Sequence, residues 1–348
     1  MGSVEPGTVL HVLLIYAGAL VCGMVGDWMN LPLPWMIGAL VFSTALRLAE
    51  LPVEVPQVTR PIGQVLIAAT VGLSFTPEAV TAVSLLLVPM VGAAILTVMA
   101  GFATAQVMVQ MSGVKWLQAV LASVPMGPVE AANLAKRNGM DPTPVIFSQT
   151  LRIVALVLII PPLLVALDGT VQDPQMVLRA EVWNAGGAML LVLCAVVGAF
   201  AARALRISNP YFVGALAGAA GAAALSMPVT ALPYPFLVAA QTFLGVWLGS
   251  VFDRPFLRGS AGFFRAAVAS TALMILMCAF LGLAFAWATG IPWYVMILAT
   301  APGSVTEMAL TAKILQDGVA LVTAFHLVRI FLILPLAPVI VRLAARMG

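Results

Sequence analysis

The chain has 348 residues, of which 62% are hydrophobic and only 8% are charged. Ordinary globular domains carry about 25% charged residues, so this composition cannot cover a water-facing surface and excludes a soluble domain. The mean hydropathy is +1.11, and the net charge of +3 is too small for a nucleic-acid-binding face. The sequence predicts one polytopic membrane unit.

Long apolar runs predict ten membrane-spanning helices, because about 20 apolar residues cross a ~30 Å hydrocarbon core. In the first half of the chain the predicted spans are 8–28, 32–48, 61–76, 79–111 and 143–167. In the second half they are 182–202, 209–227, 235–252, 266–289 and 319–341. The predicted fold class is therefore an all-α polytopic membrane protein.

One segment in each half differs from an ordinary span. The segments 115–139 and 291–317 each have a Pro/Gly break in the middle and a second arm that is only moderately apolar. A helix from Lys115 to Pro125 would be about 15 Å long, close to half of the hydrocarbon core. Each segment therefore crosses as a broken helix, or enters and returns as a re-entrant hairpin.

The chain carries an internal repeat. The stretch 122–130 (ASVPMGPVE) resembles the stretch 299–307 (ATAPGSVTE), 177 residues later, and the same offset carries Arg152 to Arg329. Repeats of this kind are the signature of a duplicated architecture. The sequence predicts two membrane repeats, residues 1–170 and 178–348, joined by the polar stretch Asp168–Glu181.

Lysine and arginine residues are enriched in cytoplasmic loops, so their distribution distinguishes the two arrangements. With a cytoplasmic N-terminus and re-entrant hairpins, all but two of the loop residues lie inside, the exceptions being Arg179 and Lys313. The inside set is Arg47, Arg60, Lys115, Lys136, Arg137, Arg203, Arg206, Arg254, Arg258, Arg265, Arg342 and Arg346. Crossing segments would spread these charges almost evenly. The distribution favours five spans per half, which makes the second repeat an inverted copy.

Inverted repeats bring two hairpins into the membrane from opposite faces, with their tips near the midplane. Non-helical backbone at that depth is tolerated only where protein buries it or water lines it, and this arrangement is typical of secondary transporters. The second arm of each hairpin begins at its tip, with Pro128 before Glu130 in one copy and Ser304 before Glu307 in the other. Ser304 to Glu307 fits a capping box, and a helix N-terminus favours an anion.

Two arginines lie in the middle of predicted spans, where insertion costs at least ~2.5 kcal/mol. Arg152 and Arg329 could clamp a carboxylate or phosphate-type group of an anionic substrate. They could equally pair with the hairpin glutamates, Glu130 and Glu307, and hold the fold together. Both interpretations hold if a substrate competes with the glutamates for the arginines.

Polar residues near the arginines and the tips complete the candidate site. Gln149 and His326 each precede an arginine by three residues and project from the same helical face; His326 could relay a proton or serve as a packing residue. Ser123 and Thr300 could offer hydroxyls to a ligand or bond back to their own helices. The predicted substrate-binding residues are Arg152, Arg329, Gly127, Gly303, Ser304, Ser123 and Thr300, and the predicted coupling or ion-pair residues are Glu130, Glu307, Gln149 and His326.

The sequence lacks the residues that several kinds of chemistry require. The chain has no phosphate-binding loop of the Gly-x-x-x-x-Gly-Lys-Ser/Thr type. Two histidines and three scattered cysteines supply no metal-ligand cluster. We therefore expect no cofactor, no metal and no enzymatic activity, and we expect the cysteines to be packing residues.

The stretch 31–40 (LPLPWMIGAL), the two hairpin motifs and Gln149-x-x-Arg152 resemble the AbrB family of bacterial inner-membrane proteins, which is also named after ammonia monooxygenase. The resemblance covers the whole chain and implies a duplicated membrane domain. The hairpin tips depart from the family's usual Pro-Gly-Gly, and His326 stands where a glutamine is expected. The family names suggest an oxygenase or a regulator of gene expression. The residues favour neither directly, because metal ligands and a DNA-binding face are both missing.

The sequence thus predicts a multi-pass protein of the bacterial inner membrane with cytoplasmic termini. The predicted function is secondary transport of a small organic anion by alternating access at the hairpin tips, coupled to a proton or a sodium ion. The alternative is a membrane-embedded metabolite sensor that acts indirectly on gene expression. The predicted partners are the lipid bilayer and the anion, without nucleic acid; assembly as a homo-oligomer stays open.

Overall fold

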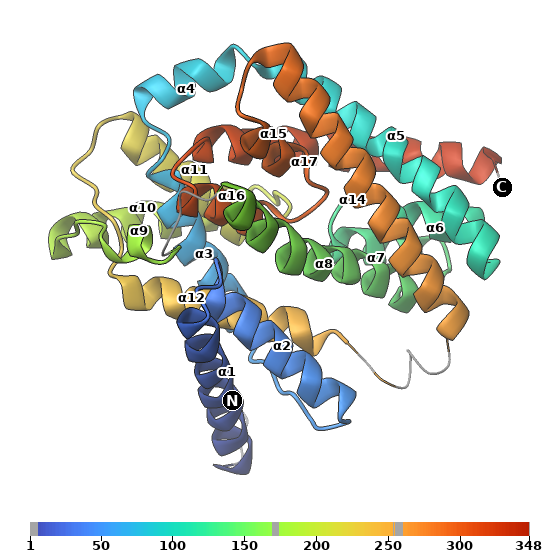
Figure 1. Ribbon diagram of the computed structural model, residues 1–348, viewed down its shortest axis with the longest axis horizontal. Coiled ribbons are helices and arrows are strands. Elements are labelled where there is room, and N and C mark those ends of the chain that lie inside the picture. The colour runs from blue at the N-terminus through green and yellow to red at the C-terminus, as the bar shows by residue number, and fades with distance from the viewer. Residues whose placement is uncertain (1–5, 169–173, 253, 255–259, 348) are drawn as a thin grey trace. The chain divides into compact units, whose positions relative to one another are not determined.

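A computed structural model describes residues 6–168, 174–252, 254 and 260–347, and every regular element within them is a helix (Figure 1). The helices of the first half are α1 (Pro6–Trp28), α2 (Pro34–Leu48), α3 (Thr59–Gly72), α4 (Pro77–Ser84), α5 (Leu87–Ser112), α6 (Trp116–Ser123), α7 (Pro128–Arg137) and α8 (Thr143–Asp168). Those that follow are α9 (Met176–Arg179), α10 (Ala185–Ala204), α11 (Pro210–Ala224), α12 (Tyr234–Ser250), α14 (Ala261–Thr289), α15 (Trp293–Thr300), α16 (Val305–Ile314) and α17 (Val319–Met347).

The number of helices that can cross a membrane is smaller than the ten predicted spans. Within the described residues, six helices are long and apolar enough, or seven if the bent pair α3 and α4 forms one span. Helices α2 and α11 have 15 residues each, which corresponds to about 22 Å against a ~30 Å core. The helices establish a multi-pass membrane protein without establishing a ten-span layout.

The predicted span 79–111 is wrong as a single helix. The chain forms α4 and then α5, with the new helix starting at Leu87. Pro89 explains the break, because proline is tolerated in the first turn of a helix but removes a hydrogen bond and clashes in the interior. Starting α5 at Leu87 places Pro89 in that first turn.

The two odd segments each form a pair of short helices around a non-helical tip. Helices α6 and α7 form the first pair, and α15 and α16 form the second. The bounds of α15 follow those of α6 by 177 residues at both ends, and those of α16 follow α7 by the same offset. The local structure therefore keeps the register found in the sequence.

The chain divides into two compact units that cut across the predicted halves. Unit 1 comprises Met1–Ala82, Pro161–Arg254 and Ala309–Ala320, and unit 2 comprises Val83–Ile160, Pro255–Met308 and Leu321–Gly348. Each unit thus takes helices from both halves. Two parts of the sequence interpretation lie outside the described residues, namely Arg258 and the stretch 169–173 of the predicted connector.

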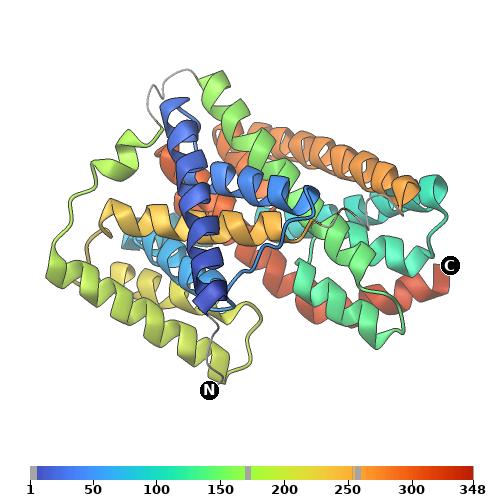
Figure 2. The same ribbon diagram turned by 90° about the horizontal axis from the view of Figure 1, so that it is seen from below.

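Close helix contacts in unit 1 depend on glycine. In Figure 2, α10 and α11 run side by side in yellow-green and yellow. A Cβ atom added to Gly218 would lie 2.1 Å from the carbonyl oxygen of Cys194, and one added to Gly214 would lie 2.4 Å from that of Gly198. The spacing Gly214-x-x-x-Gly218 therefore allows two backbones to touch, as small residues do in membrane helices.

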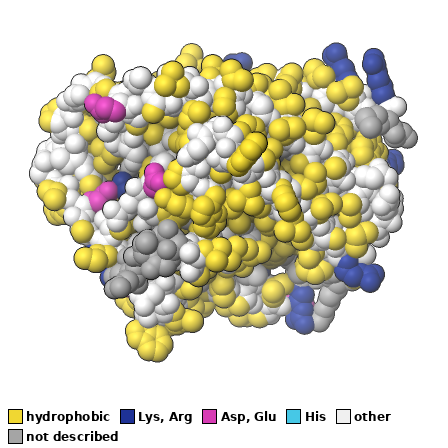
Figure 3. All heavy atoms as spheres, turned by 45° about the horizontal axis from the view of Figure 1, so that its top comes forward, with side chains coloured by type: hydrophobic (Ala, Val, Ile, Leu, Met, Phe, Trp, Pro, Cys, Tyr) yellow, Lys and Arg dark blue, Asp and Glu magenta, His cyan; other side chains and the backbone are white. Residues whose placement is uncertain are grey.

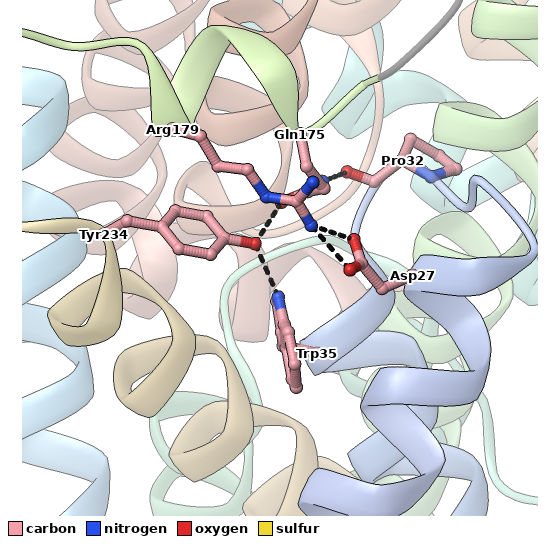
Figure 4. A network of polar contacts seen from close by, with 6 residues as sticks. All are labelled: Asp27, Pro32, Trp35, Gln175, Arg179 and Tyr234. Carbon is pink, nitrogen blue, oxygen red and sulfur yellow. Dashed lines mark hydrogen bonds and ion pairs between the residues drawn. The ribbon is translucent and has the colours of Figure 1, made fainter.

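Within unit 1, a polar network holds the connector between the two halves against α1, α2 and α12 (Figure 4). Arg179 of α9 donates to both carboxylate oxygens of Asp27, at 2.7 and 2.5 Å. The hydroxyl of Tyr234 accepts a hydrogen bond from the Trp35 indole at 2.7 Å and donates to Gln175 at 3.3 Å. Neither α9 nor this network was predicted, because the connector has no apolar periodicity.

The molecular surface carries many large apolar side chains. Leu13 on α1, Phe280 on α14 and Trp287 near the end of α14 are all exposed. Figure 3 shows hydrophobic side chains over much of one face, with lysines and arginines near its edges. Apolar surface on this scale is suited to lipid, because water-soluble monomers rarely expose it.

Candidate functional site

The predicted site residues all belong to unit 2. They lie on the two helix pairs α6/α7 and α15/α16, and on the long helices α8 and α17 that follow each pair. The two copies of the candidate site can therefore be compared within one compact unit. Each copy consists of a tip, a central arginine and the residue three positions before that arginine.

The first tip leaves α6 at Ser123, and Val124 is extended with φ −65° and ψ 126°. Gly127 has φ +91°, a left-handed conformation that glycine adopts without steric cost. Pro128 then takes the first position of α7, as predicted, because its missing N–H needs no partner there. The sequence of this tip thus determines both its turn and the start of the next helix.

The second tip is built in a similar way from different residues. Helix α15 ends at Thr300, and α16 begins at Val305. The backbone N–H of Thr306 donates to the Ser304 hydroxyl at 3.3 Å, which is the contact expected of a helix N-cap. The predicted helix start at Ser304 is confirmed.

Arg152 on α8 joins the two tips. Its side chain is only 4% exposed. Nη1 donates to the Ser123 carbonyl at 2.7 Å, and Nε donates to the Pro302 carbonyl at 3.0 Å. Since Ser123 ends α6 and Pro302 lies in the other tip, the guanidinium holds both tips within hydrogen-bonding distance of one side chain.

Gln149 supports the same arrangement. Its amide nitrogen donates to the carbonyls of Leu121 and Val124, both at 2.8 Å, and its amide oxygen accepts from Nη2 of Arg152. The last carbonyls of a helix have no partner inside that helix. Gln149 and Arg152 satisfy them at the end of α6, and the positive charge is placed at the negative end of the helix dipole.

Arg329 on α17 caps the second tip as Arg152 caps the first, but with fewer hydrogen bonds. Nη1 and Nη2 donate to the carbonyls of Ala301 and Gly303, each at 2.6 Å. The side chain is 5% exposed, and its Nε has no hydrogen-bond partner among the described residues. All three guanidinium nitrogens of Arg152 donate hydrogen bonds. The second copy of the site therefore has fewer of its polar atoms hydrogen-bonded than the first.

His326 explains part of the difference between the copies. Unlike Gln149, it bonds to its own helix, with Nδ1 2.9 Å from the Val322 carbonyl. The ring is fully buried, and Nε2 has no hydrogen-bond partner within the described part of the chain. Two buried polar atoms, Nε of Arg329 and Nε2 of His326, are therefore left unsatisfied, which is costly unless something binds them.

The acceptors around both arginines are neutral. In the parts of the chain that the structure describes, the guanidiniums bond to backbone carbonyls and to the Gln149 amide oxygen. Glu130 and Glu307 stand in the first turns of α7 and α16, and Glu307 is 4% exposed. Through these contacts the two guanidiniums cap the tips of the helix pairs.

The two predicted hydroxyls are engaged with protein groups. Thr300 donates to the carbonyls of Met296 and Cys278, at 2.8 and 2.9 Å. Ser123 lies 3.4 Å from the hydroxyl of Ser270, which in turn donates to the Thr104 carbonyl at 3.2 Å. Sequence patterns gave no sign of Ser270 or Cys278, because single small residues in apolar helices resemble ordinary packing positions.

The chemistry of the arrangement suits a negatively charged group. A buried arginine in an apolar surrounding gains most from a negatively charged ligand, and the guanidinium geometry matches a carboxylate or phosphate. Groups of three or more metal-ligating side chains in suitable positions do not occur among the described residues. The three cysteines are free thiols.

The fold and these interrupted helices define a multi-pass helical membrane protein. The chain belongs to the family described as Transition state regulatory protein AbrB, whose sequence model matches residues 2–130 and 35–345, as the hairpin motifs and the stretch 31–40 predicted. It is 26% identical over 266 residues to the "Uncharacterized protein YhjN" of Bacillus subtilis (strain 168), covering 72% of this chain and 69% of the relative. Solved structures gave no match.

Proposed function

We propose that the protein is a secondary transporter of a small organic anion in the bacterial inner membrane. One observation carries this proposal: two buried guanidiniums meet the tips of two interrupted helix pairs, and the polar atoms of one copy are left unsatisfied. Discontinuous helices at the centre of a repeat interface are typical of transporter binding sites.

The anion would bind at Arg329. The guanidinium retains a free Nε–H beside two bonds to neutral carbonyls, so its charge stays available to a ligand. A carboxylate accepting that hydrogen bond would compensate the buried charge, whose isolation is costly. Arg152, with all three nitrogens occupied, would mainly hold the two tips in place and add long-range attraction.

His326 would couple the anion to a proton. The contact from Nδ1 to the Val322 carbonyl requires a proton on Nδ1, so that Nε2 of the neutral ring is an acceptor. An anion oxygen would meet Nε2 favourably only when that nitrogen is protonated too. Anion and proton would then enter together, and their charges would cancel in the membrane.

Glu130 and Glu307 would serve as further coupling groups at the starts of α7 and α16, beside the tip backbone at Gly127, Gly303 and Ser304. The two halves would be inverted repeats with cytoplasmic termini, so that the hairpins enter from opposite faces. The matching bounds of α6 with α15 and of α7 with α16 support a duplication. Alternating access would expose the tips to each side in turn.

Uptake into proteoliposomes tests the proposal. We expect accumulation of at least one labelled acid from a panel of acetate, pyruvate, succinate, citrate and glutamate, driven by an acidic exterior. Replacing His326 by glutamine, the residue of the first copy, should abolish the dependence on the pH gradient. His11, which contacts the Pro52 carbonyl far along the sequence, provides the control His11→Gln. Gradient-independent uptake by the wild type would contradict proton coupling.

A metabolite sensor is the second candidate, because the family's description names a regulatory protein. A sensor would be stabilised by an acid of the panel against thermal unfolding and would show no flux. It would also need a partner to transmit the signal. Ligand-dependent stabilisation together with zero uptake would therefore favour sensing over transport.

A further inference from the structure

One side chain in the first copy of the site has no counterpart in the second. The carboxamide of Gln149 lies between the guanidinium of Arg152 and the end of α6. Its oxygen accepts from Nη2 of Arg152, and its nitrogen donates to the carbonyl of Leu121 at 2.8 Å. One small planar group therefore supplies an acceptor to the arginine and a donor to the helix end.

Both tips leave one carbonyl that needs such a donor. In a continuing helix a carbonyl accepts from the N–H four residues later. Four residues after Leu121 comes Pro125, just beyond the end of α6, and four residues after Leu298 comes Pro302, just beyond the end of α15. Proline has no N–H to donate, so neither carbonyl can be satisfied by its own helix.

In the second copy the carboxamide is replaced by an imidazole. His326 stands in the repeat position of Gln149, but it contacts a carbonyl of its own helix. Arg329 donates to two other carbonyls of the tip. Among the described residues, neither side chain bonds to the Leu298 carbonyl, and both Nε of Arg329 and Nε2 of His326 have no hydrogen-bond partner. A donor and an acceptor that the carboxamide would join are thus left over.

The chemistry of a suitable ligand follows from these groups. Arg329 is 5% exposed, and Leu298 and His326 are fully buried, so unsatisfied polar atoms here are costly. A carboxylate supplies the acceptor for the guanidinium, and a hydroxyl on the neighbouring carbon supplies a donor close to it, as the two ends of a carboxamide do. An ammonium group in that position would be repelled, because Arg152 also meets this tip, through the Pro302 carbonyl at 3.0 Å.

We propose that the second copy of the site binds a 2-hydroxy acid, whose carboxylate accepts from Nε of Arg329 and whose hydroxyl donates to the Leu298 carbonyl. This inference rests on the proposed anion site at Arg329 and narrows its substrate class. An acid without the hydroxyl leaves the carbonyl unsatisfied. A site that hydrogen-bonds a substrate hydroxyl discriminates strongly against an analogue that lacks it.

Thermal unfolding of the purified wild type in detergent tests the substrate class, with sodium salts of the acids at equal pH and ionic strength. Lactate and pyruvate share a carbon skeleton and differ in a hydroxyl against a keto group, and glycolate and acetate differ by one hydroxyl. Glycolate and the better enantiomer of lactate should reach half-maximal stabilisation at concentrations at least tenfold lower than acetate and pyruvate. Equal concentrations within each pair would overturn the hydroxy-acid inference alone, whereas no stabilisation by any of the four acids would contradict the anion site itself.

Replacing His326 by glutamine tests the position of the ligand. The new carboxamide should bond to Arg329 and to the Leu298 carbonyl, as Gln149 does in the first copy. We therefore expect a higher unfolding temperature without ligand, together with a response to lactate weakened at least tenfold and a loss of gradient-driven uptake. Damage to the fold would lower the unfolding temperature instead, and the control His11→Gln should respond like the wild type.

An unchanged response to lactate in His326→Gln would overturn the proposed position of the ligand. The comparison of the four acids needs no variant, so it decides the substrate class even if His326→Gln does not fold.

Discussion

Replacing Arg329 by glutamine is expected to lower anion uptake at least a hundredfold per folded protein. Glutamine retains donors for one of the carbonyls at Ala301 and Gly303 but carries no charge and lacks the unpartnered Nε. A hydrogen bond to a charged group contributes about 1.5–3 kcal/mol, and the lost attraction between buried charges adds to it. The measurement is the initial rate of uptake of the identified acid into proteoliposomes, normalised to monodisperse protein.

Two variants separate this loss from a loss of structure. Arg342 lies on the same helix and is exposed, so Arg342→Gln should transport like the wild type. Arg152→Gln should also reduce uptake, but with a larger fall in thermal stability, because Arg152 joins both tips through Ser123 and Pro302. Uptake by Arg329→Gln at the wild-type rate would show that Arg329 serves only as a helix cap.

Replacing Gly218 by alanine is expected to destabilise unit 1 by about 2 kcal/mol, the upper end of the overpacking cost less the gain in helix propensity. The added methyl group would lie 2.1 Å from the Cys194 carbonyl oxygen. Because that oxygen belongs to the backbone and cannot turn away as a side chain could, the helices α10 and α11 must separate. Overpacking typically costs 1–3 kcal/mol, against which the higher helix propensity of alanine returns about 1 kcal/mol. Thermal or denaturant unfolding in detergent measures the difference.

The same helix offers a matched control. Gly221 is one turn further along α11, and no atom lies within 4 Å of the position that its Cβ would take. Gly221→Ala should therefore leave stability unchanged or raise it slightly, through helix propensity alone. If Gly218→Ala were as stable as Gly221→Ala, the close contact of α10 and α11 would not be the source of stability assigned to it.

The sequence was sufficient for the parts of the fold that depend on local chemistry. Pro128 and Ser304 predicted the starts of α7 and α16, because prolines and hydroxyl caps act within one helical turn. The spacing of Gly214 and Gly218 is likewise typical of a close helix contact, which α10 and α11 make. By contrast, Pro89 was overlooked inside an apolar run, and the split into α4 and α5 was missed.

The candidate site was predictable in composition but not in connectivity. Insertion cost singles out Arg152 and Arg329 from the sequence alone. Apart from the Gln149 amide oxygen, their partners could not be foreseen, since they are backbone carbonyls of the tips, and a carbonyl has no sequence signal. For the same reason the difference between Gln149 and His326 gave no indication that the second copy would be left with unsatisfied atoms.

Ion pairs between residues that are distant in the sequence could not be predicted either. Asp27 near the end of α1 binds Arg179 of the connector, a pair that no sequence pattern indicated. Lys313 lies 177 residues after Lys136, the repeat offset, yet only Lys313 is buried, with its ammonium group against Glu181. Hydrophobic periodicity describes one helix at a time, whereas these pairs depend on which segments, distant in the sequence, pack side by side in the fold.

In the proposed transporter, two interrupted segments enter the membrane from opposite faces and meet at one binding site. Single cysteines at Asn138 and Gln316, both exposed near the ends of α7 and α16, test it directly in a background lacking Cys22, Cys194 and Cys278. A membrane-impermeant maleimide added to intact cells should label position 316 and leave position 138 unlabelled until the membrane is opened. Labelling of both positions from the same side would contradict the inverted arrangement and the binding site built upon it.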